Sequence, residues 1–256
     1  MSHPNILVTD NEGIVSIEIS RREKKNAITG DMYRAMSAAL SHAREQGHVR
    51  VVLIRGQSDL FTAGNDLGDF LQRKAGDPSA AIPFLHLLSA FEKPLVAAVA
   101  GNAVGIGTTM LLHCDLVYAG ESARFQLPFV KLGLCPEAAS SLLLPALAGH
   151  ARAAEMLLLG EPFNAGKALE IGLVNAVMPD AGLLDHAMAQ ARKLAAQPAA
   201  SVRLTKQLMK RAQTALIEQT MREEGRHFKG RLVSPESREA FTAFFEKRAP
   251  DFSRFN

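Results

Sequence analysis

The segment from Pro94 to Asp115, PLVAAVAGNAVGIGTTMLLHCD, constrains the fold more than any other part of the sequence. In it an apolar strand leads into a glycine-rich turn, and the turn leads directly into a helix. Because the first N–H groups of a helix have no partner inside it, such a turn can direct them toward a negative charge. Close packing of a helix on a strand also requires small residues. The segment alone leaves both uses of its glycines open.

Two well-known phosphate-binding patterns do not fit this turn. A nucleotide-hydrolase phosphate loop has a lysine followed by Ser or Thr after its last glycine, whereas Gly107 is followed by Thr108 and Thr109. A dinucleotide fingerprint reads GxGxxG, but Gly101, Gly105 and Gly107 form GxxxGxG. No acidic residue ends a clear second strand about 20 residues further on.

A chain of 256 residues that is 47% hydrophobic can build one large core without a disulfide or a metal. Cys114 and Cys135 show no CxxC spacing and no histidine cluster, so we expect buried thiols and no metal site. No apolar run reaches the ~18 residues of a membrane span, and the N-terminus lacks a basic leader. We therefore expect a cytoplasmic protein without membrane contact.

The formal net charge of +3 does not by itself indicate nucleic acid. The basic residues Arg21, Arg22, Lys24 and Lys25 suit either a solvated face or a phosphorylated small molecule. Scattered Lys and Arg residues in 206–231 are the one hint of a nucleic-acid surface, and we expect no nucleic-acid partner.

Alternating or β-branched runs predict strands at 13–19, 49–55, 95–100, 115–119 and 173–177. Helical periodicity predicts a helix capped by Asp31 that continues to about Gln46, and helix over most of 67–91 with a mobile loop near 76–78. Further helices are expected at 138–148, 150–159, 164–171, 183–196, 199–226 and 235–247. This order predicts an α/β fold in which helices cover a mixed sheet system and a ligand lies at the carboxyl ends of strands.

A second glycine turn lies within 59–67, DLFTAGNDL. Its Ala63-Gly64-Asn65 turn leads into a helix that Asp66 or Asn65 can cap. Two such turns at helix starts, both without a phosphate-loop lysine, would suit a pair of N–H donors that converge on one oxygen. The sequence does not establish that they converge.

Five segments carry a resemblance to a known family: AGNDL at 63–67, AVAGNAVGIG at 98–107, HCDLVYAGESARF at 113–125, LGLCPEAA at 132–139 and AFTAFFEKRAPDF at 240–252. From about 13 to 252 the chain resembles the crotonase, or enoyl-CoA hydratase/isomerase, superfamily. The resemblance implies a spiral of ββα/βββα units at 1–196 and a helical region at 197–256 that builds a homotrimer or a dimer of trimers. It also implies an acyl-CoA thioester substrate, with no cofactor besides the CoA that the substrate carries.

The resemblance assigns roles to individual residues. The N–H groups of Asn65 and Ile106 would hold the thioester oxygen. The CoA would bind around Lys25 and Ala27, at Ala63, Asp66 and Leu67, and at Gly105, and Lys247 would approach the CoA of a neighbouring subunit. The helix with Phe84, Leu85 and Leu88 would border the acyl pocket, although a core stripe gives the same pattern.

The chain departs from the hydratases of this family at two positions. Those enzymes carry glutamates where this chain has Thr109 and Phe129, and addition of water calls for such a pair of carboxylates. Glu137 instead stands where the isomerase branches place a single acid, and CPEAASSLLLP is similar to Δ3,Δ2-enoyl-CoA isomerases. One carboxylate can remove a proton at C2 and return it at C4. The resemblance therefore implies a shift of a double bond from C3 to C2 of 3-enoyl-CoA.

Each of these residues also has a structural interpretation. Directly after Pro136, Glu137 suits the first turn of a helix, where a carboxylate complements the dipole. His113, a possible base, is expected to be a satisfied buried histidine. Ser140 and Ser141 lack a GxSxG pattern and are expected to bond the local backbone. Phe129 would form an apolar pocket wall or fill the core.

Three other functions remain open. The chain can be an isomerase of dienoyl or ring-derived acyl-CoA, a weak enoyl-CoA hydratase, or a non-catalytic protein that binds acyl-CoA.

Overall fold

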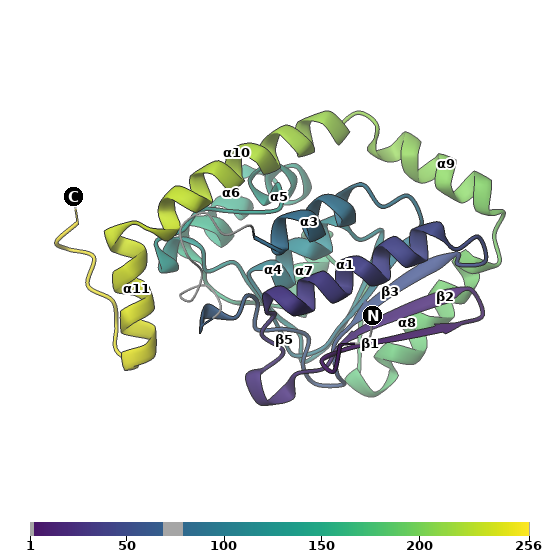
Figure 1. Cartoon of the computed structure of the whole chain (residues 1–256), viewed down its shortest axis with the longest axis horizontal. Coiled ribbons are helices and arrows are strands. Elements are labelled where there is room, and N and C mark those ends of the chain that lie inside the picture. The colour runs from purple at the N-terminus through teal and green to yellow at the C-terminus, as the bar shows by residue number, and fades with distance from the viewer. Residues whose placement is uncertain (1–2, 69–78, 256) are drawn as a thin grey trace.

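The computed structural model describes residues 3–68 and 79–255 (Figure 1). A six-stranded sheet has the order β1-β2-β3-β4-β6-β9, in which β1 is antiparallel to β2 and all other neighbours are parallel. Its strands are β1 (Ile6–Asn11), β2 (Ile14–Ile19), β3 (Val51–Arg55), β4 (Leu95–Val99), β6 (Leu116–Gly120) and β9 (Ala176–Met178). A smaller sheet contains β5 (Asn102–Val104), β7 (Arg124–Gln126) and β8 (Phe163–Asn164).

Helices cover both faces of the six-stranded sheet. Successive strand side chains point to opposite faces, so Val52 and Ile54 of β3 join the core under α1 (Gly30–Glu45) and α3 (Ala81–Ser89). Val51 and Leu53 face the other way and pack with α8 (Asp180–Ala195). Burial on both faces explains why the central strands are almost continuously apolar.

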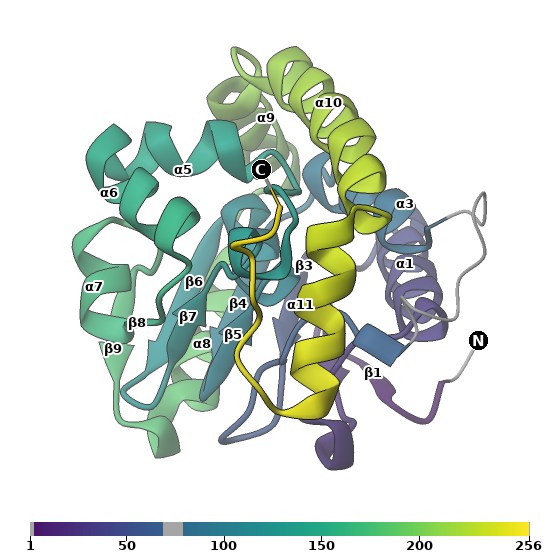
Figure 2. The same ribbon diagram turned by 90° about the vertical axis from the view of Figure 1, so that its left-hand side faces the viewer.

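The remaining helices are short, except for those near the C-terminus. They are η1 (Arg22–Lys24), α4 (Ile106–Thr109), η2 (Met110–His113), η3 (Val130–Leu132), α5 (Ser140–Ala148), α6 (His150–Ala154), the π-helical turn η4 (Glu155–Leu159), α7 (Ala165–Glu170), α9 (Ala199–Lys210), α10 (Thr214–Leu232) and α11 (Pro235–Glu246). Helices α9 and α10 run along one side of the molecule, α10 contacts α5, and α11 packs against η3 (Figures 1 and 2).

A buried ion pair ties α9 to the sheet. The Lys206 ammonium lies 2.6 Å from a carboxylate oxygen of Asp115 and donates to the Lys93 carbonyl at 2.8 Å. The same Asp115 oxygen accepts from the Leu95 N–H at 2.7 Å, where β4 begins. This contact fixes the first of the C-terminal helices on the body of the protein.

The five predicted strands are all present, with ends that shift by at most three residues. Strands β1, β5, β7 and β8 were not predicted. Thr29, not Asp31, caps α1, because the Thr29 hydroxyl accepts from the Met32 N–H. The region 199–226 holds two helices, since α9 ends at Lys210 and α10 begins at Thr214.

The expected helix at 138–148 begins later than predicted. Ala138 and Ala139 have left-handed backbone angles, with φ of 60° and 56°, so α5 starts at Ser140. The predicted loop near 76–78 lies outside the described residues. On either side of that gap, residues 67 and 68 are helical and α3 occupies 81–89. Within the described residues, every helix is too short or too polar to cross a membrane.

Candidate active site

The two glycine turns lie side by side. The Thr62 N–H donates to the Asn102 carbonyl at 2.8 Å, and the Val104 N–H donates to the Thr62 carbonyl at 3.1 Å. Gly64 has a φ of +89°, and a Cβ on it would lie 2.6 Å from the Val104 carbonyl oxygen. Only glycine permits both this backbone conformation and this approach. The turns that the sequence could not place together are therefore in direct backbone contact.

Asn65 and Ile106 stand at the exits of these two turns. Ile106 is the first residue of α4, so its N–H lies outside the hydrogen bonds of the helix. Across the described part of the chain, the N–H groups of both residues lack an acceptor. The Asn65 side chain is bound elsewhere, because its oxygen accepts from the Tyr33 hydroxyl of α1 at 2.5 Å. The structure thus places the two predicted donors at the ends of adjacent turns, and their convergence on one oxygen stays a prediction.

Two glycines of the Pro94–Asp115 segment have different structural roles. Gly105 has φ 56° and ψ −116°, a conformation that other residues avoid, and no atom would lie within 4 Å of a Cβ on it. A Cβ on Gly107 would lie 2.6 Å from the Thr62 methyl group. Gly105 therefore shapes the turn beside open space, and Gly107 permits close packing.

Backbone hydrogen bonds gather the predicted CoA-binding residues around the same turns. The Ala63 N–H donates to the Lys25 carbonyl at 2.9 Å, and the Asp66 N–H donates to the Ile28 carbonyl at 3.0 Å. The intervening Ala27 and the following Leu67 are partly exposed, as is Gly105. Lys247 is not joined to this cluster by any contact among the described residues and lies at the end of α11. Its approach to the CoA of another subunit stays a prediction.

Asn26, which lies between the predicted CoA-binding residues Lys25 and Ala27, is the structural centre of this cluster. It is fully buried, and its side-chain amide donates to the Ile19 and Phe61 carbonyls at 3.0 Å. Its φ of 57° places it in the left-handed region, where asparagine is enriched. Asp66 is also fixed: its carboxylate accepts from Arg21 at 2.6 Å and from the Gly68 N–H at 2.9 Å, which caps the helix that begins at residue 67.

Glu137 lies in irregular backbone between η3 and α5. The interpretation of Glu137 as a first-turn helix residue is therefore wrong. Its Oε1 is completely buried and has no hydrogen-bond partner among the described residues. Burial, and next the repulsion by Glu224, raises the pKa of Glu137 to about 8. A carboxyl group in this state can exchange a proton near neutral pH.

Two side chains from other elements hold the left-handed residues that follow Glu137. The His113 Nε2 lies 2.8 Å from the Ala138 carbonyl oxygen, and burial lowers the pKa of His113 to about 4, so the neutral ring donates this bond. Glu224 of α10 accepts from the Ala139 N–H at 2.6 Å and from the Ser141 N–H at 3.0 Å. Glu224 was missed because it belongs to no local motif.

His113 is a satisfied buried histidine, as predicted. The Ser140 hydroxyl donates to the Glu137 carbonyl at 2.6 Å, which confirms its predicted bond to local backbone. The same prediction is wrong for Ser141, whose hydroxyl donates to the distant Glu224 carboxylate. Phe84 is buried and packs against Tyr33 with ring centroids 5.5 Å apart. Its predicted core role is confirmed, and a border with an acyl pocket stays a prediction.

Both positions where hydratases carry glutamates are buried. Thr109 is completely inaccessible, and its hydroxyl oxygen lacks a partner among the described residues. Phe129 is 4% exposed and belongs to the main core. Neither position supplies a carboxylate. Among the described residues, no three His, Cys, Asp or Glu side chains cluster so that they could hold a metal ion.

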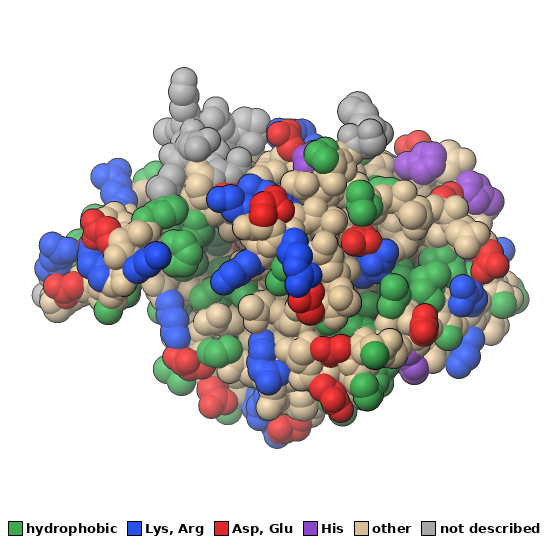
Figure 3. Space-filling model, turned by 90° about the horizontal axis from the view of Figure 1, so that it is seen from below, with side chains coloured by type: hydrophobic (Ala, Val, Ile, Leu, Met, Phe, Trp, Pro, Cys, Tyr) green, Lys and Arg blue, Asp and Glu red, His purple; other side chains and the backbone are tan. Residues whose placement is uncertain are grey.

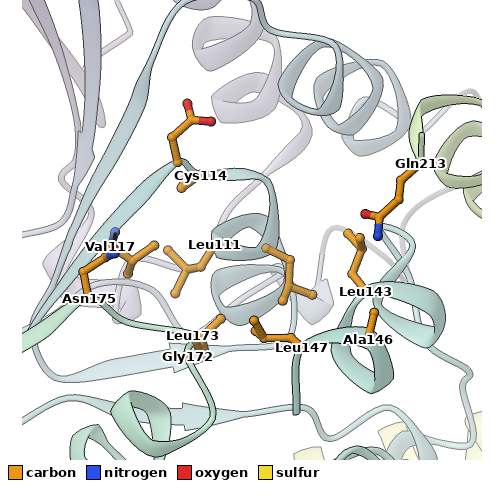
Figure 4. Close-up of a pocket in the computed structure, with 12 residues that line it drawn as sticks. Leu111, Cys114, Val117, Leu143, Ala146, Leu147, Gly172, Leu173, Asn175 and Gln213 are labelled. Carbon is orange, nitrogen blue, oxygen red and sulfur yellow. Dashed lines mark hydrogen bonds between the residues drawn. The ribbon is translucent and has the colours of Figure 1, made fainter. Parts of the chain in front are cut away.

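A cavity of about 290 Å³ is lined by residues that include none of the predicted site residues (Figure 4). Leu111, Leu143, Leu147 and Leu173 surround it, and Asn175 and Gln213 lie on opposite sides. Its titratable groups are Asp115, already paired with Lys206, and Cys114, whose pKa burial raises to about 12. This cavity offers no reactive group.

The basic residues of the N-terminal group and of 206–231 differ in their burial and pairing. On the face seen in Figure 3, acidic and basic side chains are interspersed. Of the basic residues in 206–231, Lys206 is buried and Arg222 pairs with Glu218 at 2.7 Å. In the N-terminal basic group, Arg21 pairs with Asp66, whereas Lys24 and Lys25 are exposed.

Comparisons with known proteins agree on one family. The family model described as enoyl-CoA hydratase/isomerase matches residues 9–254. Enoyl-CoA delta isomerase 2 of Rattus norvegicus is 36% identical over 95% of this chain, which spans 64% of the length of that relative. The 1,2-epoxyphenylacetyl-CoA isomerase of Escherichia coli (strain K12) is 33% identical over 94% of this chain and 95% of its own length.

A solved structure supports the fold independently. The crystal structure of enoyl-CoA hydratase/isomerase from Pseudoalteromonas atlantica T6c superimposes with a TM-score of 0.92 at 43% identity. The match covers 97% of this chain and 99% of the other. The spiral fold that the resemblance implied is confirmed.

Proposed function

The chain belongs to the enoyl-CoA hydratase/isomerase family, and on that premise we propose that it moves the double bond of a 3-enoyl-CoA from C3 to C2. The observation that carries this proposal is Glu137. Its Oε1 is buried without a hydrogen-bond partner among the described residues, and its pKa is raised to about 8. Hydration would need a second carboxylate, and Thr109 and Phe129 occupy the two positions where hydratases place theirs.

The proposed chemistry begins with the ionised form of Glu137. The carboxylate removes a proton from C2 of the thioester, and the electron pair moves toward the thioester oxygen to give a dienolate. The N–H groups of Asn65 and Ile106 would donate to that oxygen, and removal of one such donor typically costs about 3 kcal/mol of transition-state stabilisation. The protonated Glu137 then returns the proton at C4, which leaves the double bond between C2 and C3.

The raised pKa suits both halves of this transfer. A carboxyl with a pKa near the working pH loses and regains a proton at little cost in either direction. Because the base must be ionised to start, we expect kcat/KM to rise with pH up to about the pKa of free Glu137, which is about 8.

The turns around Lys25, Ala63 and Asp66 would bind the CoA part of the substrate, so that no further cofactor is needed. Ala27, Leu67 and Gly105 are partly exposed, which supports a ligand site at these turns. We also propose that the C-terminal helices build a homotrimer or a dimer of trimers, in which Lys247 approaches a neighbouring active site.

The direct test incubates the purified chain separately with 3-hexenoyl-CoA and with crotonyl-CoA. We expect a rapid double-bond shift in the first and slow or no hydration of the second. Glu137→Gln should lose at least about 10³-fold in kcat while it still binds CoA thioesters. The matched control is Glu223→Gln, the same change at an exposed position. Rapid hydration of crotonyl-CoA without isomerisation, or full activity of Glu137→Gln, would refute the proposal.

A relative named 1,2-epoxyphenylacetyl-CoA isomerase favours one second candidate, an isomerase of ring-derived acyl-CoA that uses the same acid. A panel of linear, dienoyl and ring-derived thioesters distinguishes the two by their kcat/KM values. Tight binding of every member without any change in product would instead indicate a non-catalytic acyl-CoA binding protein.

A further inference from the structure

We infer that Glu224 is the positioning residue of the active site: from helix α10 it holds the turn that presents Glu137 and sets the charge next to it. This inference rests on the proposed function, in which Glu137 is the base. The hydrogen bonds of Glu224 go to Ala139 and Ser141, so its effect on the reaction passes through Glu137.

The N-terminus of α5 supplies the first part of the argument. Its N-cap residue, Ala139, has no side chain that can cap a helix. Glu224 takes that place from 85 residues further along the chain: one carboxylate oxygen accepts from the Ala139 N–H and the other from the Ser141 N–H and hydroxyl. Glu224 is only 7% exposed, and its carboxylate lies where these three donors meet.

The backbone conformation supplies the second part. Ala138 and Ala139 are consecutive residues with positive φ, a combination that alanine adopts only when its surroundings enforce it. The His113 ring fixes the Ala138 carbonyl, and Glu224 fixes the next N–H. Without Glu224 the two alanines would relax into the helix that their propensity favours, and Glu137 would turn with them.

The charges around Glu137 supply the third part. Burial raises the pKa of Glu224, and the hydrogen bonds that Ala139 and Ser141 donate to it act in the opposite direction because they favour the ionised carboxylate. Of the other titratable groups on the packed elements, His113 is neutral and the Cys135 thiol has a pKa raised by burial. Arg231 of α10 binds the Gly133 carbonyl at 2.9 Å and pairs with Glu236. Glu224 is therefore the negative charge that disfavours ionisation of Glu137.

Three variants separate geometry from charge. Glu224→Gln removes the charge but keeps one oxygen that can accept from Ala139. Glu224→Asp keeps the charge on a shorter side chain, and Glu224→Ala removes both. Glu223→Gln, an exposed change on the same helix, is the control for a general effect of altered charge. Each full-length protein is measured for the pH dependence of kcat/KM with 3-hexenoyl-CoA. The Glu137 carboxyl of each protein is also titrated by infrared spectroscopy in the absence of substrate. For this, the spectrum of the same protein with the additional change Glu137→Gln is subtracted at each pH, so that the remaining carboxyl signal belongs to Glu137.

We expect Glu224→Gln to move both midpoints to lower pH, and Glu224→Asp to keep the wild-type midpoint with a lower kcat. Glu224→Ala should shift the midpoint and also lower the plateau kcat roughly 10- to 100-fold, because the base is misplaced. Wild-type midpoints in Glu224→Gln, by both measurements, would reduce Glu224 to a structural cap and overturn the inference. If the wild-type protein shows no double-bond shift, the proposed function fails, and the infrared titration still decides whether Glu224 sets the pKa of Glu137.

Discussion

Replacement of Glu137 by glutamine should stabilise the folded protein, and by more at high pH than at low pH. Burial, and next Glu224, raises the pKa of Glu137 from 4.5 to about 8. The folded state therefore holds this proton more tightly than the unfolded state does. For such a group, the stability it contributes is fully present below pH 4.5 and is lost as the pH rises through about 8. Glutamine has a similar shape and does not titrate, so the variant escapes this loss.

The size of the effect follows from the two pKa values. The rise from 4.5 to about 8 is worth, at about 1.36 kcal/mol for each unit, roughly 5 kcal/mol when the pH exceeds both values. This is a ceiling, since water that reaches the half-buried residue screens part of the penalty. At pH 7 the folded form is still mostly protonated, and the ceiling falls to roughly 3 kcal/mol.

The assay is urea-induced unfolding of both proteins at one fixed protein concentration, from about pH 5 to about pH 9. The free energy of unfolding of the wild type is subtracted from that of Glu137→Gln at each pH, which removes the contribution of every other titrating group. We expect the difference to be small near pH 5, to grow with pH and to level off above about pH 8. A difference that is constant over this range would show that Glu137 has an ordinary pKa, and the argument for its role as a base would fail.

Three further substitutions test the supports of the site. Gly105→Ala meets no steric clash but places alanine at φ 56°, so it should cost about 1–3 kcal/mol in urea unfolding and lower kcat/KM, because the Ile106 N–H moves. Thr29→Ala removes the cap of α1 and should cost about 1 kcal/mol, with Thr205→Ala on the exposed surface of α9 as the control. Lys206→Met leaves the Asp115 carboxylate without its cation and should lower the free energy of unfolding by about 3 kcal/mol at neutral pH. A loss no larger than that of Lys131→Met, which breaks an exposed ion pair, would contradict this prediction.

The strength of a local pattern decided which parts of the fold could be predicted. The central strands β3 and β4 were found because burial on both faces makes them continuously apolar. Strand β1 was missed because only its first residue is buried, so ILVTDN carries little hydrophobic signal. Strands β5, β7 and β8 contain two or three residues each, too few to show a period.

The same reasoning applies to the site. The glycine turns were visible because the residues that form them are adjacent in the sequence, and the backbone bonds between Thr62 and Val104 then brought the turns together. The conformation at Glu137 was not visible. Ala138 and Ala139 are strong helix formers, so local propensity predicted helix from 138, and hydrogen bonds from distant residues overrode it.

That override determines the chemistry available to Glu137. Had α5 begun at Ala138, its first N–H groups and its dipole would have faced Glu137 and lowered the pKa of the carboxyl. Instead the Ala139 and Ser141 N–H groups are committed to Glu224, and Ser140 donates to the Glu137 backbone carbonyl. Glu137 Oε1 is left buried and without a donor among the described residues, which is the condition that keeps its proton exchangeable near neutral pH. The strained alanines and the distant carboxylate together turn a common helix-start glutamate into a candidate base.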